Sequence, residues 1–340
     1  MSLQDNKPEV SVIMPVYNGE AYIVEAIHSV LNQSFTDFEF IIINDGSTDH
    51  TQTLIERFSD ARIKSFYHEN QGVARSLNTA LKYAVGKYIW RHDADDICLP
   101  EQLQTQIQFL KSHTDFALVS TQIAFMTNRG KIAYNYKQPK DVFFENAPFI
   151  KVVRAHFNPY SPITHATVLI KKEVFETVGY YRTEFKTSED TDLWLRILEH
   201  YNAAVMHYCS YFVRINSSSA TQVHKKTNTF YRDLAYKFAD ERNTKGTDSL
   251  QRGEIMPEPI ENELEVQNDP NFGKHYRNDL LDFRYRLVLD AKDYINAFKI
   301  MRLSIKDGWR LSRVWKAIFL PLLGDKIVDK GIKAKKAMKL

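Results

Sequence analysis

Three aspartates follow one apolar stretch of the chain, in "YIWRHDADDICLP" at residues 88–100. Asp93, Asp95 and Asp96 are close enough in sequence to repel one another unless a positive charge lies among them. A divalent cation meets that need, and carboxylate oxygens favour Mg²⁺ or Mn²⁺ over zinc. Because Mg²⁺ is commonly held by one or two carboxylates together with substrate phosphates, we expect a metal-bound diphosphate here. The alternative is a solvated turn that caps the helix expected to begin at Pro100.

A second acidic group lies further along, in "TSEDTDLWLRI" at residues 187–197. The apolar residues that follow have helical spacing, so Glu189, Asp190 and Asp192 are expected in the first turn of a helix. Ser188 would be its N-cap, and acidic residues in a first turn complement the helix dipole without any catalysis. The local sequence leaves two interpretations open, a helix start and a reactive carboxylate pair.

Strands and helices alternate in the first third of the chain. The patterns predict strands at residues 10–17, 38–45, 63–69 and 87–93, and helices at 22–31 and 72–84. Strands that are apolar throughout, rather than in alternation, are typical of a parallel sheet covered by helices on both faces. We therefore predict an α/β fold of the Rossmann-like kind, with a mostly parallel sheet flanked by helices.

Polar residues stand where three of these strands end. Asn18 follows the first strand, Asp45 ends the second, and Asp93 ends the fourth. Ligands of such sheets bind beyond the carboxyl ends of the strands, so we expect these side chains to face one crevice. After the second strand, Ser47 or Thr48 is expected to cap the next helix.

The rest of the chain predicts one large domain followed by a helical appendage. Residues 243–270 contain three prolines and several glutamates and are the expected linker. The expected organisation is an α/β domain at residues 1–242, this linker, and a basic helical C-terminal region at 271–340.

Basic residues are concentrated at the C-terminus. The net charge of the whole chain is +3, yet residues 299–340 hold 12 lysines and arginines against 3 acidic residues. Leu311, Trp315 and Phe319 share one helical face there, as in helices that lie on anionic membranes. The alternative is a helix that packs on protein. Nucleic acid is less favoured because no recognition motif is present.

The composition excludes several classes of protein. The chain has 340 residues, of which 44% are hydrophobic and 26% charged, as in ordinary globular proteins. Two cysteines, Cys98 and Cys209, are too few for a disulfide framework or a zinc module, and they fit a reducing cytoplasm. No secretory signal pattern is seen at the start, and no apolar run approaches the roughly 20 residues of a membrane span. We expect a cytoplasmic protein that can bind the inner face of the cell membrane peripherally.

Four blocks resemble, in this order, the motifs of family 2 glycosyltransferases with the GT-A fold. They are "VSVIMPVYNGEAYIVEAIHSVLNQSFTDFEFIIINDGSTDHT", "NQGVARSLNTAL", "GKYIWRHDADDICLP" and "SEDTDLWLRI", within residues 8–215. The resemblance implies an inverting, metal-dependent hexosyltransferase of the bacterial cell-surface polysaccharide type. Such an enzyme moves a sugar from a nucleoside-diphosphate sugar, foremost a UDP-sugar, to a saccharide or lipid-linked saccharide.

The resemblance also implies roles for individual residues. Asp45 matches the carboxylate that binds the nucleotide base, and Asp93 and Asp95 match the Asp-x-Asp motif that holds Mn²⁺ or Mg²⁺. Asp190 matches the catalytic base, with Glu189 beside it. Further donor-binding positions are Pro15, Tyr17, Asn18, Glu20, Gly72, Arg75 and Asn78, the last three in a degenerate form of their motif.

The chain departs from the family pattern at two points. "FVRINSSS" keeps Arg214 but lacks the histidine that many relatives have nearby, so a metal or phosphate ligand there is in doubt. The Gln-x-x-Arg-Trp motif of processive synthases is absent, which favours the addition of one or a few sugars. Two alternative functions stay open, a catalytically silent nucleotide-sugar binding protein and a sugar nucleotidyltransferase. The donor sugar, the acceptor, the linkage and the oligomeric state are not encoded in any pattern that we recognise.

Overall fold

The computed structural model describes residues 7–126, 132–134, 147–157, 161–214 and 225–259. They belong to one compact unit, formed by Met1–Tyr136 and Asn146–Leu264. The predicted C-terminal region at 271–340 and its amphipathic helix lie outside the described residues. The domain boundaries drawn from the sequence therefore stay a prediction.

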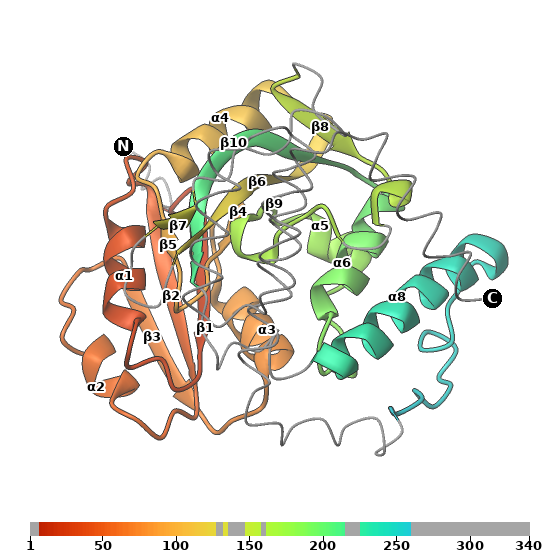
Figure 1. Cartoon of the computed structure of the whole chain (residues 1–340), viewed down its shortest axis with the longest axis horizontal. Helices are drawn as coiled ribbons and strands as arrows, with labels where there is room; N and C mark the ends of the chain where they lie inside the picture. Colours follow the sequence, from red (N-terminus) through yellow and green to blue (C-terminus); the bar gives the residue numbers. More distant parts are fainter. Residues whose placement is uncertain (1–6, 127–131, 135–146, 158–160, 215–224, 260–340) are drawn as a thin grey trace, which may run out of the picture. The chain divides into compact units, whose positions relative to one another are not determined.

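A ten-stranded sheet runs through the described part of the chain (Figure 1). Its strands are β1 (Val10–Val16), β2 (Phe38–Asp45), β3 (Ile63–His68), β4 (Tyr88–Arg91), β5 (Ile97–Cys98), β6 (Phe116–Met126), β7 (Ile132–Tyr134), β8 (Phe149–Val152), β9 (Leu169–Lys171) and β10 (Asn202–Arg214). Their order is β3-β2-β1-β4-β9-β6-β10-β5, with β7 paired to β6 and β8 paired to β10.

The first four strands are parallel, as the sequence predicts, and the second half of the sheet is mixed. β2 pairs in parallel with β1 and β3, and β4 pairs in parallel with β1. β9 then runs antiparallel to both β4 and β6, while β10 is parallel to β6. The reversal at β9 places a strand from late in the sequence beside β4, at the centre of the sheet.

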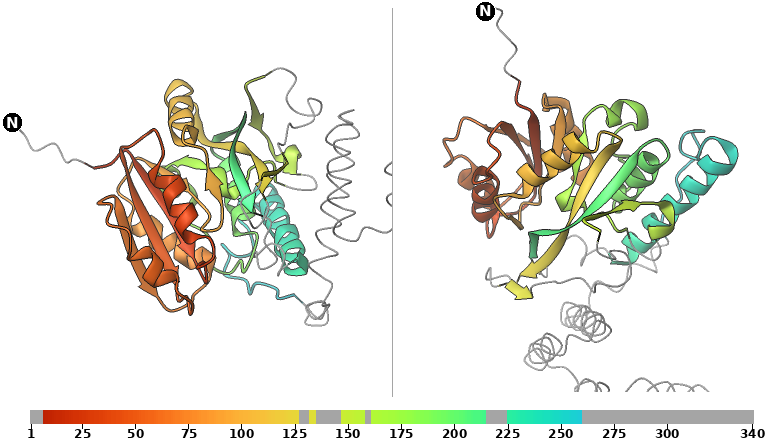
Figure 2. Two further views of the ribbon diagram at one scale, coloured as in Figure 1. Left: turned by 60° about the vertical axis from the view of Figure 1, so that its left-hand side comes forward. Right: turned by 90° about the horizontal axis from the view of Figure 1, so that it is seen from above.

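Helices cover the sheet as expected of an α/β fold (Figure 1). They are α1 (Ile23–Leu31), α2 (Thr51–Ile55), α3 (Val73–Tyr83), α4 (Gln102–Ser112), α5 (Val174–Val178), α6 (Glu189–Leu198) and α8 (Lys225–Lys245), with 3-10 turns at Arg154–Phe157 and His165–Thr167. In both views of Figure 2, α8 runs beside α6, and the two helices are in contact. Among the described residues, no helix combines the length and the apolar character of a membrane span.

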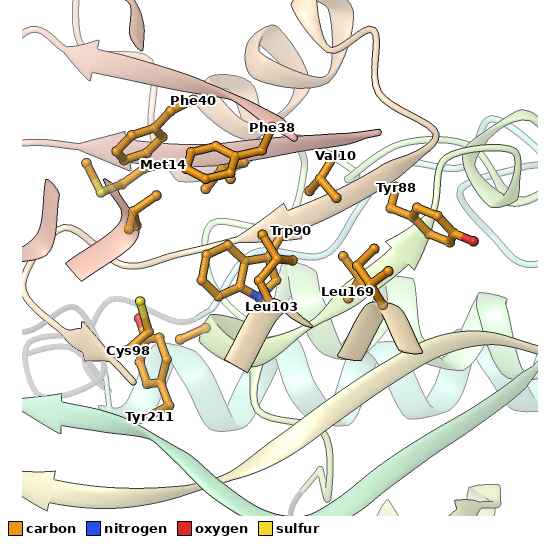
Figure 3. Packing of buried hydrophobic residues seen from close by; sticks show 14 of the residues in the cluster. Val10, Met14, Phe38, Phe40, Tyr88, Trp90, Cys98, Leu103, Leu169 and Tyr211 are labelled. Carbon is orange, nitrogen blue, oxygen red and sulfur yellow. The ribbon is translucent and has the colours of Figure 1, made fainter. Parts of the chain in front are cut away.

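Alternate residues of the parallel strands pack on opposite faces of the sheet, because successive side chains of a strand point to opposite sides. Val10, Met14 and Trp90 belong to one core cluster (Figure 3), which also contains apolar residues of α1 and α4. Ile13 and Ile41 are also buried but lie outside that cluster, on the face where α3 contacts β1 and β2. Burial on both faces explains why the strands are apolar throughout.

One buried glutamine ties the core of β4 to later elements. Trp90 Nε1 donates a hydrogen bond to Gln106 Oε1 at 3.0 Å. The Gln106 Nε2 group donates to the backbone carbonyl oxygens of Val119, at 3.2 Å, and Thr167, at 2.6 Å. A buried polar group without a partner is costly, so this amide fixes α4, β6 and the turn before β9 against β4.

Replacing this amide tests its contribution to stability. Gln106→Ala leaves the Trp90 N–H group and the Thr167 carbonyl without their bonds, and we expect a loss of about 2–4 kcal/mol in the free energy of unfolding. Urea unfolding followed by tryptophan fluorescence measures it. Gln108→Ala, an exposed position on the same helix, is the control and should change stability by less than about 0.5 kcal/mol. Equal stability of the two variants would contradict the stabilising role of the Gln106 amide.

Candidate functional site

The loop after β1 is closed by the loop after β2. Asn18 Oδ1 accepts the backbone N–H of Thr48 at 2.8 Å, and the Asn18 N–H donates to Ser47 Oγ at 2.9 Å. Asn18 has a φ of 51°, a left-handed conformation that is uncommon for a residue other than glycine. The predicted helix cap is therefore wrong, because Ser47 and Thr48 bind the first loop while α2 begins only at Thr51.

Glu20 is bound within the same pair of loops. One of its carboxylate oxygens accepts the backbone N–H of His50 at 3.0 Å and lies 2.8 Å from Nδ1 of the His50 ring. The backbone bond from His50 is the main reason that the pKa of Glu20 is lowered. Of the other positions predicted in this loop, Tyr17 is 53% exposed and Pro15 is partly buried.

Asp45 joins the end of β2 to the start of α3. Its two carboxylate oxygens accept the backbone N–H groups of Gln71, at 2.8 Å, and Gly72, at 3.0 Å, and His68 Nδ1 lies 3.3 Å away. Gly46 permits this approach, since a Cβ atom there would lie 2.5 Å from the Asn70 backbone nitrogen and its φ is +74°. An ionised carboxylate accepts about four hydrogen bonds, so Asp45 keeps capacity for a ligand N–H group.

The other two positions predicted on α3 differ in their surroundings. Arg75 is exposed, so its guanidinium is open to a ligand. Asn78 is partly buried and bonds both ways to the backbone of Tyr181, which comes from the segment before α6. The structure therefore brings Asp45 and Gly72 together and turns Asn78 toward another part of the chain.

The three aspartates after β4 are not a solvated helix cap. Asp96 is buried and accepts the Arg214 backbone N–H at 2.7 Å, while the Asp95 carbonyl oxygen accepts Arg214 Nε at 2.7 Å. α4 begins only at Gln102, after the short strand β5. Burial, and after it the charge of Asp93, raises the pKa of Asp95 to about 6 and that of Asp96 well above its usual value.

The second acidic group lies in the first turn of α6, as predicted. Ser188 occupies the N-cap position without a capping bond, has a φ of 59°, and donates its hydroxyl hydrogen bond to the Asn228 carbonyl of α8. Asp190 Oδ1 accepts the Thr191 N–H at 2.7 Å. Burial, and next the charge of Asp190, raises the pKa of Glu189 to about 8, and burial also raises the pKa of Asp190.

Arg91 acts electrostatically on both acidic groups. It ends β4, is 6% exposed, and its Nη1 is 2.5 Å from Oδ2 of Asp93 in an ion pair. Burial opposes the charge of this guanidinium, but Asp93 together with Tyr211 and Tyr181 outweighs that cost, and the pKa of Arg91 is raised. The same positive charge opposes the rise that burial causes in the pKa of four carboxyl groups, namely Asp95, Asp96, Glu189 and Asp190. The two groups, far apart in sequence, therefore share one electrostatic environment.

Sequence reasoning missed two residues of this site. Arg91 is one, and its only signal is a charged residue inside the apolar run "YIWR". Tyr211 is the other. It lies on β10, is fully buried, and its hydroxyl oxygen accepts the Asp93 N–H at 3.0 Å. Nothing in the sequence around Tyr211 indicates this contact, since it depends on β10 returning to the sheet.

Two residues near the acidic groups, Asp192 and His165, are packed among partner side chains. Asp192 is fully buried between Arg182, at 3.2 Å, and Arg196, at 2.9 Å, so it is an ion-pair partner. Burial lowers the pKa of His165 well below its usual value, and its Nε2 is 2.9 Å from the Tyr181 hydroxyl. Both surroundings are those of packed residues.

The donor set fits a divalent cation that also binds its substrate. In the described part of the chain, no three histidine, cysteine, aspartate or glutamate side chains are grouped to hold a metal alone. Asp95 and Asp93 are nevertheless crowded carboxylates, because the charge of Asp93, after burial, raises the pKa of Asp95. Two carboxylates suffice for Mg²⁺ or Mn²⁺ when substrate phosphates supply further oxygens.

Comparisons with known proteins show which family this chain is similar to. A model of the family described as "Glycosyl transferase family 2" matches residues 11–179. The putative glycosyltransferase EpsE of Bacillus subtilis is 33% identical over 202 residues, which are 56% of this chain and 67% of that protein.

Two solved structures are similar in fold. The mannosyltransferase PcManGT from Pyrobaculum calidifontis, in complex with GDP-Man and Mn²⁺, has a TM-score of 0.52 and 19% identity over 89% of this chain and 88% of that one. Residues 1–349 of TarS from S. aureus, in complex with UDP-GlcNAc, have a TM-score of 0.50 and 18% identity over 88% and 89%. These similarities support the GT-A fold.

The raised pKa of Glu189 predicts how stability depends on pH. Its neutral carboxyl stabilises the fold fully below the unfolded pKa of 4.5, and this contribution is lost as pH rises through about 8. Glutamine stays neutral, so Glu189→Gln should match the parent protein at pH 4.5 and exceed its free energy of unfolding by on the order of 5 kcal/mol at pH 9.

Thermal unfolding across this pH range measures the effect, and a Tm higher than that of the parent protein by about 10–20 °C is expected at pH 9. Glu184→Gln, an exposed neighbour, is the control and should follow the parent protein at every pH. If the difference in Tm between Glu189→Gln and the parent protein did not change with pH, this result would contradict a buried Glu189 that stays protonated at neutral pH.

Proposed function

This chain belongs to glycosyl transferase family 2 and is a glycosyltransferase, and we propose that it is an inverting enzyme that uses nucleoside-diphosphate sugars. The donor that we favour is a UDP-sugar, and the acceptor is a hydroxyl of a saccharide or lipid-linked saccharide. The observation that carries the proposal is that the charge of Arg91 acts both on the aspartates after β4 and on the carboxylates of α6. A donor bound at the first group would thus be close to a base in the second.

We assign the donor end to the edge where β1, β2 and β4 finish. Asp45 would accept an N–H group of the nucleotide base with its remaining capacity, beside the exposed ring of Tyr17. Arg75, exposed on α3, carries a positive charge suited to phosphate oxygens. Asp95 and Asp93 would hold Mn²⁺ or Mg²⁺, which when bound neutralises charge on the departing diphosphate.

We assign the base to Asp190 and a neutral supporting role to Glu189. At neutral pH Glu189 keeps its proton, because its pKa is about 8, so the pair carries one negative charge instead of two. Asp190 takes the proton from the acceptor hydroxyl as its oxygen bonds to the anomeric carbon. The bond from that carbon to the phosphate oxygen breaks, and the nucleoside diphosphate leaves with the electron pair. One displacement from the opposite face inverts the anomeric carbon.

Substitution of the base tests the mechanism. Asp190→Asn keeps the size of the side chain but removes the proton acceptor, so we expect kcat to fall about 10²–10⁴-fold while the Kd for the nucleoside diphosphate is unchanged. Release of nucleoside diphosphate measures turnover, and calorimetry measures binding. Glu184→Gln is the control for loss of a carboxylate in the same region. Turnover within twofold of the parent protein would reject Asp190 as the base, and a product with the donor's anomeric configuration would reject inversion.

The donor class can be tested without knowing the acceptor. UDP- and GDP-sugars are screened by thermal shift in the presence of Mn²⁺, and a bound donor at 100 times its Kd should stabilise the protein by about 2.7 kcal/mol. Asp95→Asn should remove the Mn²⁺ dependence of that shift. Binding of nucleotide sugars without turnover of any of them would favour the alternative of a silent binding protein.

The basic C-terminal tail indicates where the enzyme would bind its acceptor. We propose that residues 304–340 bring the enzyme to an anionic membrane that carries a lipid-linked acceptor, from the sequence pattern alone. The full chain should sediment with vesicles containing about 30% anionic lipid, and a truncation before Ser304 should stay in the supernatant. Equal sedimentation of the two proteins would remove the membrane from the proposal.

A further inference from the structure

The Asn78 side chain joins two parts of the fold that are far apart in sequence. Its Nδ2 group donates to the Tyr181 carbonyl oxygen at 2.8 Å, and its Oδ1 accepts the Tyr181 N–H at 3.0 Å. The amide thus satisfies both backbone groups of one residue, as a neighbouring strand would do. α3 supplies Asn78, and this helix starts beside Asp45 at the donor end.

Tyr181 belongs to a short segment, residues 178–182, that we call the strap. The Arg196 guanidinium of α6 donates to the carbonyl oxygens of Val178 and, at 2.9 Å, Tyr180. Arg182 Nη1 lies 3.2 Å from Oδ1 of Asp192, also on α6. The strap is therefore bound on one side to the helix whose first turn carries Glu189 and Asp190.

Two further contacts hold the strap, one at Tyr181 and one at Arg182. The Tyr181 ring is 3% exposed, and its hydroxyl is 2.9 Å from His165 Nε2. Arg182 Nη1 is 2.8 Å from Oδ2 of Asp248, which is fully buried. All these partners come from the second half of the described chain, whereas Asn78 comes from the first.

We propose that Asn78 is a positioning residue, which through the strap sets the place of the Asp190 carboxylate relative to the donor site. This inference rests on the proposed function, in which Asp190 is the base. Ser188, next to the acidic pair, has a left-handed φ of 59°, a conformation that persists only where the surroundings hold it. A displacement of about 1 Å between base and acceptor costs on the order of 10²-fold in rate, so loss of this link should be visible in turnover.

The test separates positioning from donor binding. Asn78→Ala removes both hydrogen bonds, and Asn78→Asp keeps the acceptor for the Tyr181 N–H but places an oxygen against the Tyr181 carbonyl. We expect kcat to fall about 10–100-fold in Asn78→Ala, and less in Asn78→Asp, with the Kd for UDP and Mn²⁺ unchanged within twofold. Turnover is measured as the release of UDP, with water as the acceptor. The donor is the UDP-sugar that gives the largest thermal shift in the screen.

A matched control lies next to it on α3. Thr79→Ala removes a hydroxyl that bonds within the helix, to the Arg75 carbonyl, and should leave kcat and Kd unchanged. Hydrogen exchange gives a readout that needs no substrate. Amides of residues 181–190 should exchange faster in Asn78→Ala, while those of α1 keep the rate of the parent protein.

Several outcomes overturn the inference. A UDP affinity that weakens more than tenfold in Asn78→Ala would make Asn78 a donor ligand, whether or not kcat also falls. Unchanged kcat, or unchanged exchange of residues 181–190, would show that the strap holds α6 without Asn78. Failure of the proposed function is distinguishable, because it appears as full turnover in Asp190→Asn, whereas the exchange result for Asn78→Ala does not depend on the base.

Discussion

A buried positive charge at the end of β4 holds the acidic site together. Carboxylates from the loop after β4 and from α6 would repel one another in a low-dielectric interior, and each is costly to bury when ionised. Arg91 lowers this cost for both groups, and Asp93 in turn keeps the guanidinium charged. The pKa values of Asp95 and Glu189 are still raised, so Arg91 offsets only part of the cost of burying these carboxylates. In the proposed function, a cation at Asp95 and a proton on Glu189 would supply the rest of the compensation.

The topology of the sheet explains how two distant acidic segments meet. The parallel strands β1, β2 and β4 place their polar ends along one edge, which suits a nucleotide. β9 then reverses direction beside β4, and β10 returns to supply Tyr211 and Arg214 against the aspartates. In the chain, α6 lies between β9 and β10. The path from β9 back to β10 therefore places the first turn of α6 within the electrostatic reach of Arg91. A purely parallel sheet would have given the donor edge without the opposing carboxylates.

The site is built at a local cost in backbone conformation and charge burial. The two residues other than glycine with positive φ in the described part of the chain are Asn18, in the loop after β1, and Ser188, beside Glu189 and Asp190. Both are held by hydrogen bonds to other loops or helices, which offset that cost. Residues of similar type nearby, such as Asp192 with its two arginines, are instead fully paired and serve packing. Partial pairing is what distinguishes Glu189 and Asp190 from this neighbour.

The sequence by itself determined the parallel half of the fold and the positions of Asp45, Asp93 and Asp95 after strands and of Asp190 in the first turn of a helix, because apolar runs and helical spacing are local patterns. It also placed Glu189 correctly at a helix start. The tertiary structure decided which polar residues meet. Asn78 is bound to Tyr181, Ser47 and Thr48 bind Asn18 instead of capping a helix, and Arg91 and Tyr211 join the site without any motif. The physical reason is that hydrogen bonds and ion pairs between distant segments depend on how strands reverse and return, and local hydrophobic spacing carries no record of that path.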